Sequence, residues 1–311
     1  MTVLLATDFD ATALALWQGL LQAALPDERI VIDRQTVDDA EIDIAIVANP
    51  PLGALRGLTH LRLIQSLWAG VDKLLGDASL PPAIPIARMV DPAMSAAMAE
   101  TALWAVLSLH RSFSAYAAQQ RTQTWQPLPQ RRADEVSIAV LGLGEMGRGV
   151  ASRLAAQGYR VNGWSLRPTL LPTVATHHGD EGLTDVLREA DIVINLLPLT
   201  PVTRGLFCTR HFEAMRRGAS LVNLARGAHV VDVDLLAALD RGHLQQAVLD
   251  VFNTEPLPAD HRYWRHPRVT VLPHAAAQTD ARSAAQIAAA NVRRLRAGDT
   301  LQNLVDRARG Y

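Results

Sequence analysis

Three polar side chains in the second half of the chain have types and positions that suit carbonyl chemistry. Arg226, Glu255 and His274 each come shortly after a separate short apolar run. Histidine can donate a proton to a carbonyl oxygen, a carboxylate can support the charged imidazole, and a guanidinium can bind a carbonyl oxygen and a carboxylate together. This set suits the reduction of a 2-keto acid by hydride transfer.

Each of these residues also has an ordinary structural explanation. Arginines that follow strands often form ion pairs, and many histidines are simply surface side chains. Ligands of open parallel α/β sheets, however, bind beyond the carboxyl ends of the strands, where residues from several strands meet. We therefore predict that Arg226, Glu255 and His274 share one crevice and form a catalytic set.

A glycine-rich string lies upstream of this set, directly after an apolar run and before a helical segment. It has the form G-x-G-x-x-G, with glycines at Gly142, Gly144 and Gly147. The first glycine permits a tight turn, the second lets the backbone approach a pyrophosphate, and the third allows close helix packing. The free amides of residues 144–147, which include Glu145 and Met146, would hold the phosphates. The string predicts a dinucleotide site.

The residues after the next strand indicate which dinucleotide is bound. NAD sites usually carry an acidic residue there, but this chain has Trp164, Ser165 and Arg167 near that strand end. A hydroxyl and a guanidinium can bind a 2′-phosphate, which a carboxylate would repel. We therefore predict NADP, with NADPH preferred over NADH. The alternative is that Arg167 is a solvated loop residue.

Elements that could position these residues alternate along the whole chain. Short apolar runs and helical patterns follow one another, which is typical of parallel α/β sheets. A long helix is expected over residues 93–118 and a terminal helix over 281–297. The expected strands are residues 3–6, 29–32, 42–48, 62–67, 84–89, 136–141, 160–164, 191–196, 220–224, 246–249 and 268–272.

Composition narrows the classes of function. The 30 basic and 31 acidic residues are interspersed and give a net charge of −1, which argues against nucleic acid as a partner. The single cysteine, Cys208, excludes an intrachain disulfide and a cysteine-built metal site, and we expect it to be a small buried side chain. His177 and His178 are expected in a polar loop, with no metal bound. No leader pattern or long uninterrupted apolar run is present, so we expect a cytoplasmic protein without membrane contact.

The ordered motifs resemble those of the D-2-hydroxyacid dehydrogenase family. After the glycine string come N-L-A-R-G at 223–227, L-D-V-F-N-T-E-P-L at 249–257 and P-H at 273–274. Within that family, W-S-L-R at 164–167, L-L-P-L-T at 196–200 and W-R-H-P at 264–267 look like the glyoxylate/hydroxypyruvate reductase A group. The resemblance implies NADPH-dependent reduction of glyoxylate to glycolate and of hydroxypyruvate to D-glycerate.

The resemblance also implies two Rossmann-like, doubly wound parallel-sheet domains. The first, flavodoxin-like and substrate-binding, would combine residues 1–96 with 284–311, and the NAD(P)-binding domain would span 97–283. A homodimer through the cofactor domain is implied, with the arm 117–132 and Trp125 at the interface. The backbone amides of Ala69, Gly70 and Val71 would bind the substrate carboxylate. The implied cofactor contacts are Leu197, Pro198, Leu224, Ala225 and, near the nicotinamide amide, Asp250.

Two residues depart from the family pattern, and other functions stay open. Ala48 stands where an aromatic residue is common, and Trp68 stands where glycine can occur. Trp68 either closes the substrate pocket against large 2-keto acids or packs between the domains. The alternatives are an NAD-dependent D-2-hydroxyacid dehydrogenase for a bulkier substrate, a β-hydroxyacid dehydrogenase with a similar glycine loop, and a non-enzymatic dinucleotide-sensing corepressor.

Overall fold

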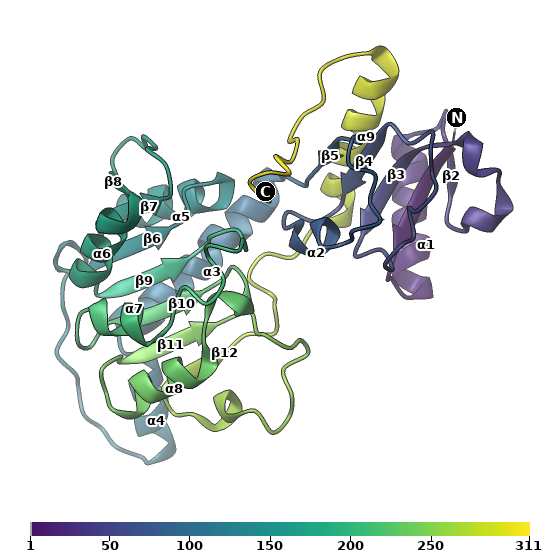
Figure 1. Ribbon diagram of the computed structural model, residues 1–311. Coiled ribbons are helices and arrows are strands. Elements are labelled where there is room, and N and C mark those ends of the chain that lie inside the picture. The colour runs from purple at the N-terminus through teal and green to yellow at the C-terminus, as the bar shows by residue number, and fades with distance from the viewer. Residues whose placement is uncertain (1) are drawn as a thin grey trace. The chain divides into compact units, whose positions relative to one another are not determined.

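The structure, a computed structural model, describes residues 2–311 and divides into two compact units (Figure 1). Unit 1 comprises the chain as far as Met94 together with Thr279–Tyr311, and unit 2 is Ser95–Gln278. The chain therefore leaves unit 1, builds unit 2 and returns. Each unit is built around its own parallel sheet.

Unit 1 has a five-stranded parallel sheet in the order β2-β1-β3-β4-β5. This is the flavodoxin-like order, in which the strands on the two sides of β1 are reached by opposite crossovers. The central strands are apolar and buried, as expected for strands covered on both faces. The strands are β1 (Thr2–Thr7), β2 (Arg29–Val31), β3 (Ile42–Ala48), β4 (Leu63–Ser66) and β5 (Ile86–Ala87).

The C-terminal segment completes unit 1. On helix α9, Asn291 donates to Gln65 of β4 (2.8 Å), and Arg296 forms ion pairs with Glu28 and Asp43. Leu304 then bridges to Ala87 of β5 in the antiparallel sense. The helical elements of unit 1 are α1 (Ala11–Ala24), α2 (Asp72–Leu75), α9 (Ala281–Ala297), η1 (Arg34–Thr36) and η2 (Asp39–Glu41).

Unit 2 has a seven-stranded parallel sheet in the order β12-β11-β10-β9-β6-β7-β8. Its first six strands along the chain follow the Rossmann order, with the topological switch point between β6 and β9. The predicted fold class is confirmed for both units. The strands are β6 (Ser137–Leu141), β7 (Arg160–Ser165), β8 (Ala175–His178), β9 (Ile192–Asn195), β10 (Ser220–Asn223), β11 (Gln246–Leu249) and β12 (Val269–Val271).

Helices cover both faces of this sheet. Alternate strand residues face opposite sides: Leu221 packs with α6 and α8, whereas Val222 packs with α3 and α5. This alternation explains why each central strand is apolar throughout. The helical elements are α3 (Pro92–His110), α4 (Phe113–Arg121), α5 (Glu145–Ala156), α6 (Gly179–Glu189), α7 (Thr209–Ala214), α8 (Asp232–Asp240), η3 (Ala133–Glu135), η4 (Gly227–His229) and η5 (Arg262–Arg265).

Several sequence expectations were wrong in detail. The single helix expected over 93–118 is broken between α3 and α4, where Ser112 takes a left-handed conformation (φ 56°). His177 and His178 lie in β8, which was missed because its residues are polar and it forms the sheet edge. Cys208 is only partly buried, and its Sγ lies 3.7 Å from His211 Nδ1.

Helix α3 is long and hydrophobic. Its length of 19 residues and its mean hydropathy of 1.2 would allow a membrane span by composition alone. In the structure, 39% of its most hydrophobic 18-residue stretch is buried. One face of the helix packs into the unit 2 core through side chains that include Ala102 and Val106. A core helix of this kind meets the same length and hydropathy criteria as a membrane span.

Candidate functional site

His274 and Glu255 form a hydrogen-bonded pair at the carboxyl end of the unit 2 sheet. His274 Nδ1 lies 2.8 Å from Glu255 Oε2, and the other Glu255 oxygen accepts a hydrogen bond from the Phe252 amide at 2.8 Å. Both carboxylate oxygens are thus engaged, which fixes the carboxylate and the imidazole orientation. His274 Nε2 has no partner within residues 2–311. The pair can therefore present Nε2 to a ligand.

Asp250 supports the segment that carries His274. Its carboxylate is buried and accepts hydrogen bonds from the Ala275 amide (2.7 Å) and the Ala276 amide (3.1 and 3.2 Å). Its carbonyl oxygen accepts from the His274 amide at 2.9 Å. These bonds hold His274 in a left-handed backbone conformation (φ 52°). The Asp250 side chain therefore stabilises this turn.

Arg226 follows β10 in extended backbone, and its Nη1 donates to the Ala225 carbonyl at 2.7 Å. The next residue, Gly227, packs directly on the backbone of Phe252, because a Cβ there would lie 1.9 Å from the Phe252 carbonyl carbon. Phe252 in turn holds Glu255. Because Gly227 has no side chain, the loop of Arg226 can pack closely against the loop of Glu255.

The other predicted cofactor contacts near Arg226 lie in the two loops after β9 and β10. Leu197, Leu224 and Ala225 are buried, and Pro198 is partly buried. Sequence analysis missed the side chains that hold these loops, which are Asn195, Asn223 and His229. The sequence pattern that could have identified them is an asparagine at the end of each of two adjacent apolar strands.

The glycine loop joins β6 to α5 at the switch point of the sheet. Gly142 has φ 98°, and a Cβ on Gly147 would lie only 1.7 Å from the Gly142 oxygen. A Cβ on Gly144, by contrast, would meet no atom within 4 Å, so this backbone is open to a ligand. The first amides of α5 lack helical acceptors. Within that first turn, Glu145 is exposed and Met146 is partly buried.

At the end of β7 the predicted cofactor residues differ in accessibility. Trp164 is buried in the core, and its indole donates to the Gly179 carbonyl at 2.8 Å, so its side chain is structural. Ser165 Oγ donates to the Arg167 carbonyl (2.7 Å) and lies 3.0 Å from Thr169 Oγ1, which closes a tight loop. The Arg167 side chain is exposed and has no partner within residues 2–311.

The predicted substrate loop lies in unit 1, between β4 and α2. The Trp68 amide donates to Ser66 Oγ at 3.0 Å, its carbonyl accepts from the Met89 amide at 3.0 Å, and its ring packs edge-on against Phe9. Its indole Nε1 is buried without a hydrogen-bond partner in residues 2–311. Among those residues no acceptor binds the backbone amides of the next three positions, Ala69, Gly70 and Val71.

Ala48 lies at the end of β3 and is fully buried. Its carbonyl accepts a hydrogen bond from the Asp8 amide at 3.2 Å. Its methyl group therefore belongs to the sheet core.

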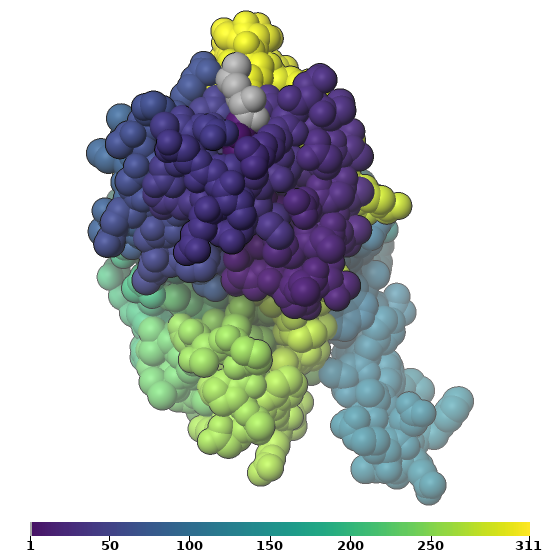
Figure 2. Space-filling model, turned by 90° about the vertical axis from the view of Figure 1, so that its right-hand side faces the viewer, coloured from purple at the N-terminus to yellow at the C-terminus, as the bar shows by residue number. Residues whose placement is uncertain are grey.

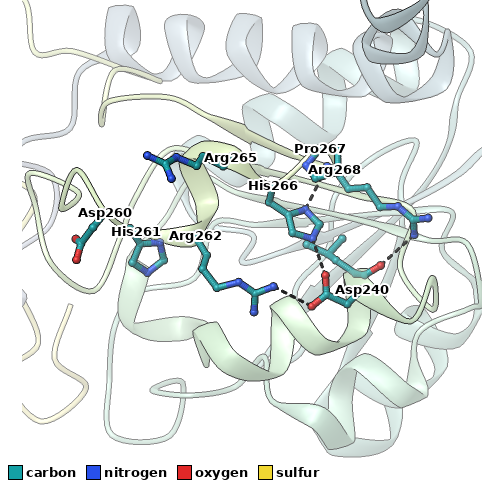
Figure 3. Close-up of a pocket in the computed structure, with 9 residues that line it drawn as sticks. Asp240, Asp260, His261, Arg262, Arg265, His266, Pro267 and Arg268 are labelled. Atoms are coloured by element: carbon teal, nitrogen blue, oxygen red, sulfur yellow. Dashed lines mark hydrogen bonds and ion pairs between the residues drawn. The ribbon is translucent and has the colours of Figure 1, made fainter.

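A hollow next to α8 contains many charged side chains but is separate from the His274 pair (Figure 3). Asp240 accepts from Arg262 (3.0 Å) and His266 (3.1 Å), while Arg268 donates to the Leu239 carbonyl (3.0 Å). Arg265 points away from Asp240 in this view. These pairs fasten η5 to α8, so they fix the excursion between β11 and β12 that carries Glu255.

Among residues 2–311, no group of three or more His, Cys, Asp or Glu side chains is arranged to hold a metal ion. The His274 pair offers a side chain that can transfer a proton and a carboxylate that can stabilise charge, at the carboxyl end of a sheet that also carries a glycine loop of the dinucleotide-binding type.

Comparison with known proteins identifies the family. The model of the D-isomer specific 2-hydroxyacid dehydrogenase NAD-binding domain matches residues 103–276, more than half of the chain. The chain belongs to the D-isomer specific 2-hydroxyacid dehydrogenase family. The protein is thus an NAD(P)-dependent oxidoreductase.

Relatives of known name or structure cover nearly the whole chain. Glyoxylate/hydroxypyruvate reductase A of Serratia proteamaculans is 41% identical over 300 residues, 95% of this chain and 96% of that protein. A family member from Xanthobacter autotrophicus, solved with NADPH and MES, is 38% identical with a TM-score of 0.94, covering 100% and 99% of the chains. An NADPH-dependent glyoxylate/hydroxypyruvate reductase of Sinorhizobium meliloti, solved with NADP and sulfate, is 32% identical with a TM-score of 0.92, covering 100% and 99%. The predicted resemblance to this reductase group is confirmed.

Proposed function

We propose that the protein reduces small 2-keto acids, with glyoxylate and hydroxypyruvate as substrates and NADPH as the preferred cofactor. The observation that carries the proposal is the His274–Glu255 pair, which leaves His274 Nε2 available at the carboxyl end of the same sheet that carries the glycine loop. The names of the similar Serratia and Sinorhizobium proteins support this substrate class, and the ligands in two related structures support NADP(H).

The cofactor would bind along the carboxyl end of the unit 2 sheet. The glycine loop fits a pyrophosphate, because Gly144 is open and the first amides of α5 are available. Arg167 and Ser165 would hold the 2′-phosphate, with Arg167 supplying a charge that has no partner within residues 2–311. The backbone of Leu197, Pro198, Leu224 and Ala225 would line the rest of the groove. Bound NADPH supplies the hydride.

The side chains have separate roles in this proposal. Arg226 binds the carboxylate and carbonyl oxygen of the keto acid and stabilises the negative charge that develops on that oxygen. His274 donates the proton from Nε2 to the same oxygen. Glu255 holds the imidazole in one orientation through Nδ1 and stabilises its charged form. The amides of Ala69, Gly70 and Val71 hold the substrate carboxylate.

A steady-state assay tests the function directly. Glyoxylate, hydroxypyruvate and a set of larger 2-keto acids are each assayed with NADPH and with NADH. We expect the highest kcat/KM for the two small substrates with NADPH. Preference for NADH with a bulky keto acid would instead support the alternative dehydrogenase.

We also propose a homodimer through the arm that follows α4. Trp125 is 98% exposed, an unusual state for so large an apolar side chain. The arm folds back on α4 through a hydrogen bond from the Leu128 amide to the Tyr116 hydroxyl (2.9 Å). Figure 2 shows this part of the chain, in blue-teal, projecting to the side of the green residues of unit 2. Light scattering of Trp125→Ser should show a monomer, while Trp264→Ser, a control at another exposed tryptophan, should stay dimeric.

A further inference from the structure

A fully buried polar cluster lies between the carboxyl ends of β9 and β10. It consists of Asn195, Asn223 and His229, each with 0% exposure. Asn195 Nδ2 lies 2.9 Å from Asn223 Oδ1 and 2.9 Å from His229 Nδ1. Unlike Asp250 or Glu255, these three side chains match none of the predicted catalytic or cofactor positions.

The hydrogen bonds of this cluster are consistent with one arrangement of protons. Asn195 Oδ1 accepts from the Leu197 amide at 3.2 Å, so its Nδ2 is the donor to both Asn223 and His229. His229 Nδ1 must then be an acceptor, which leaves the Nε2 proton to donate to the Pro198 carbonyl at 3.2 Å. The imidazole is therefore neutral with its proton on Nε2, an assignment that follows from its partners.

The cluster reaches the backbone of both loops that border the proposed site. In the loop after β9 it binds the Leu197 amide and the Pro198 carbonyl. In the loop after β10, Asn223 Nδ2 donates to the Arg226 carbonyl (2.9 Å), which also accepts from the His229 amide (3.3 Å). Buried polar networks with satisfied bonds hold their members rigidly, because any broken bond leaves a desolvated polar group.

We propose that His229 is a positioning residue that sets the loops of Pro198 and Arg226 relative to each other through Asn195 and Asn223. The Nε2 side of the ring holds the loop predicted to contact the cofactor. The Nδ1 side holds the asparagine pair behind Arg226. This inference rests on the proposed function for the role of Arg226, but its effect on cofactor binding can be measured without turnover.

Two substitutions separate the two sides of the ring. His229→Asn can place an amide oxygen near the Nδ1 position, so it keeps the bond from Asn195 and loses the bond to Pro198. His229→Gln can place an amide nitrogen near the Nε2 position, so it keeps the bond to Pro198 and loses the acceptor for Asn195. The control is His243→Asn, because His243 Nε2 donates to the Phe212 carbonyl (2.7 Å) of α7, at the opposite end of the sheet.

The full-length variants are compared by thermal unfolding, by the Kd for NADPH from its fluorescence, and by kcat and KM for glyoxylate. All three should fold with Tm values lowered by several degrees, roughly 2–8 °C, as expected for one lost buried hydrogen bond. His229→Asn should raise the Kd for NADPH about tenfold. His229→Gln should lower kcat/KM for glyoxylate about tenfold to a hundredfold, because small displacements of a substrate-binding group are costly. His243→Asn should leave both values within about twofold.

A double-mutant comparison shows whether the effect passes through Arg226. In an Arg226→Lys background, His229→Gln should have a much smaller effect on kcat/KM than in the natural protein. Unchanged Kd and kcat/KM in both His229 variants, or independent effects in the double mutant, would overturn the proposal. If the natural protein binds NADPH but does not reduce 2-keto acids, the proposed function fails while the Kd comparison still tests His229. Should a His229 variant not fold, Asn223→Asp, which loses the donor to Arg226, takes its place.

Discussion

Glu255 contacts His274 through one carboxylate oxygen while the backbone amide of Phe252 holds the other. The loop of Glu255 is itself fastened to α8, where Asn253 binds Asp232 and the Val230 carbonyl. The Glu255 carboxylate therefore has little freedom to move away from the His274 imidazole. Such support is what keeps a proton donor in one orientation during catalysis.

The first prediction concerns this pair. His274→Asn should lower kcat for glyoxylate reduction by about 10²–10⁴-fold, the usual contribution of a general acid. Glu255→Gln should lower it by a smaller factor, roughly 10–10², because the amide oxygen can still accept from the ring but the charge and one of the two acceptors are lost. Glu213→Gln, at an exposed glutamate paired with Arg241, is the control. Single-turnover rates with NADPH would check this, and an unimpaired His274→Asn would remove His274 as the acid.

The second prediction concerns cofactor choice at the end of β7. Arg167→Ala should lower kcat/KM for NADPH by roughly tenfold to a hundredfold, the worth of a hydrogen bond to a charged group. The value for NADH should barely change, because NADH lacks the 2′-phosphate. Arg188→Ala on the exposed side of α6 serves as the control. Equal losses with both cofactors would mean that Arg167 does not contact the phosphate.

The third prediction uses two glycines of one loop. Gly147→Ala should destabilise unit 2 by about 1–3 kcal/mol or more, because its Cβ would overlap the Gly142 carbonyl. Gly144→Ala has open space around the new methyl group and should cost less than about 1 kcal/mol. It should nevertheless weaken NADPH binding, since the methyl group would block the approach of the pyrophosphate. Thermal unfolding and NADPH titration of both variants distinguish the two effects, and tight NADPH binding by Gly144→Ala would contradict the proposed loop contact.

The fourth prediction concerns Trp68 in unit 1. If its ring restricts the substrate pocket, Trp68→Ala should lower the selectivity for glyoxylate over bulkier 2-keto acids. Trp68→Phe keeps an aromatic ring that can pack against Phe9 but removes the indole N–H. Retained selectivity in Trp68→Phe would assign the effect to ring volume, and lost selectivity would assign it to the N–H. Unchanged selectivity in Trp68→Ala would refute a role in the pocket.

The fifth prediction concerns stability at acid pH. Burial alone would raise the pKa of Asp191, but hydrogen bonds from Arg131 and the Ser137 amide, with the charge of Arg216, hold it below its ordinary value. A lowered folded-state pKa stabilises the fold above the unfolded pKa of about 3.9, and this contribution is lost as the pH falls through the folded value.

Asp191→Asn should therefore reduce the free energy of unfolding at pH 7 by about 1–3 kcal/mol, and the difference should shrink below about pH 4. Asp185→Asn, at an exposed pair with Arg188, is the control and should change little. Urea unfolding at both pH values checks the sign, and a difference that grows with acidity would contradict it.

Much of this arrangement was predictable from the sequence, because the apolar runs, the glycine spacing and the order of the motifs are local patterns. The strand order and the closeness of Glu255 and His274 follow from such patterns with the rule that ligands gather at the carboxyl ends of parallel strands. The commitment of Asp250 to the Ala275–Ala276 turn and the burial of Trp164 and Ala48 depend on long-range packing. The edge strand β8 lacked the apolar signal that identifies central strands.

Unit 1 combines strands β1 to β5 with helix α9, which follows unit 2 along the chain. Strands β4 and β5 pair with Asn291 and Leu304, and Glu28 and Asp43 form ion pairs with Arg296. None of these contacts can form before that later segment has been synthesised. Unit 2 is continuous from Ser95 to Gln278 and needs no later segment. During synthesis, therefore, the unit that is encoded second is the one that can fold first. Strands β1 to β5 then stay incomplete, and open to chaperones or to aggregation, until α9 and Leu304 have been synthesised.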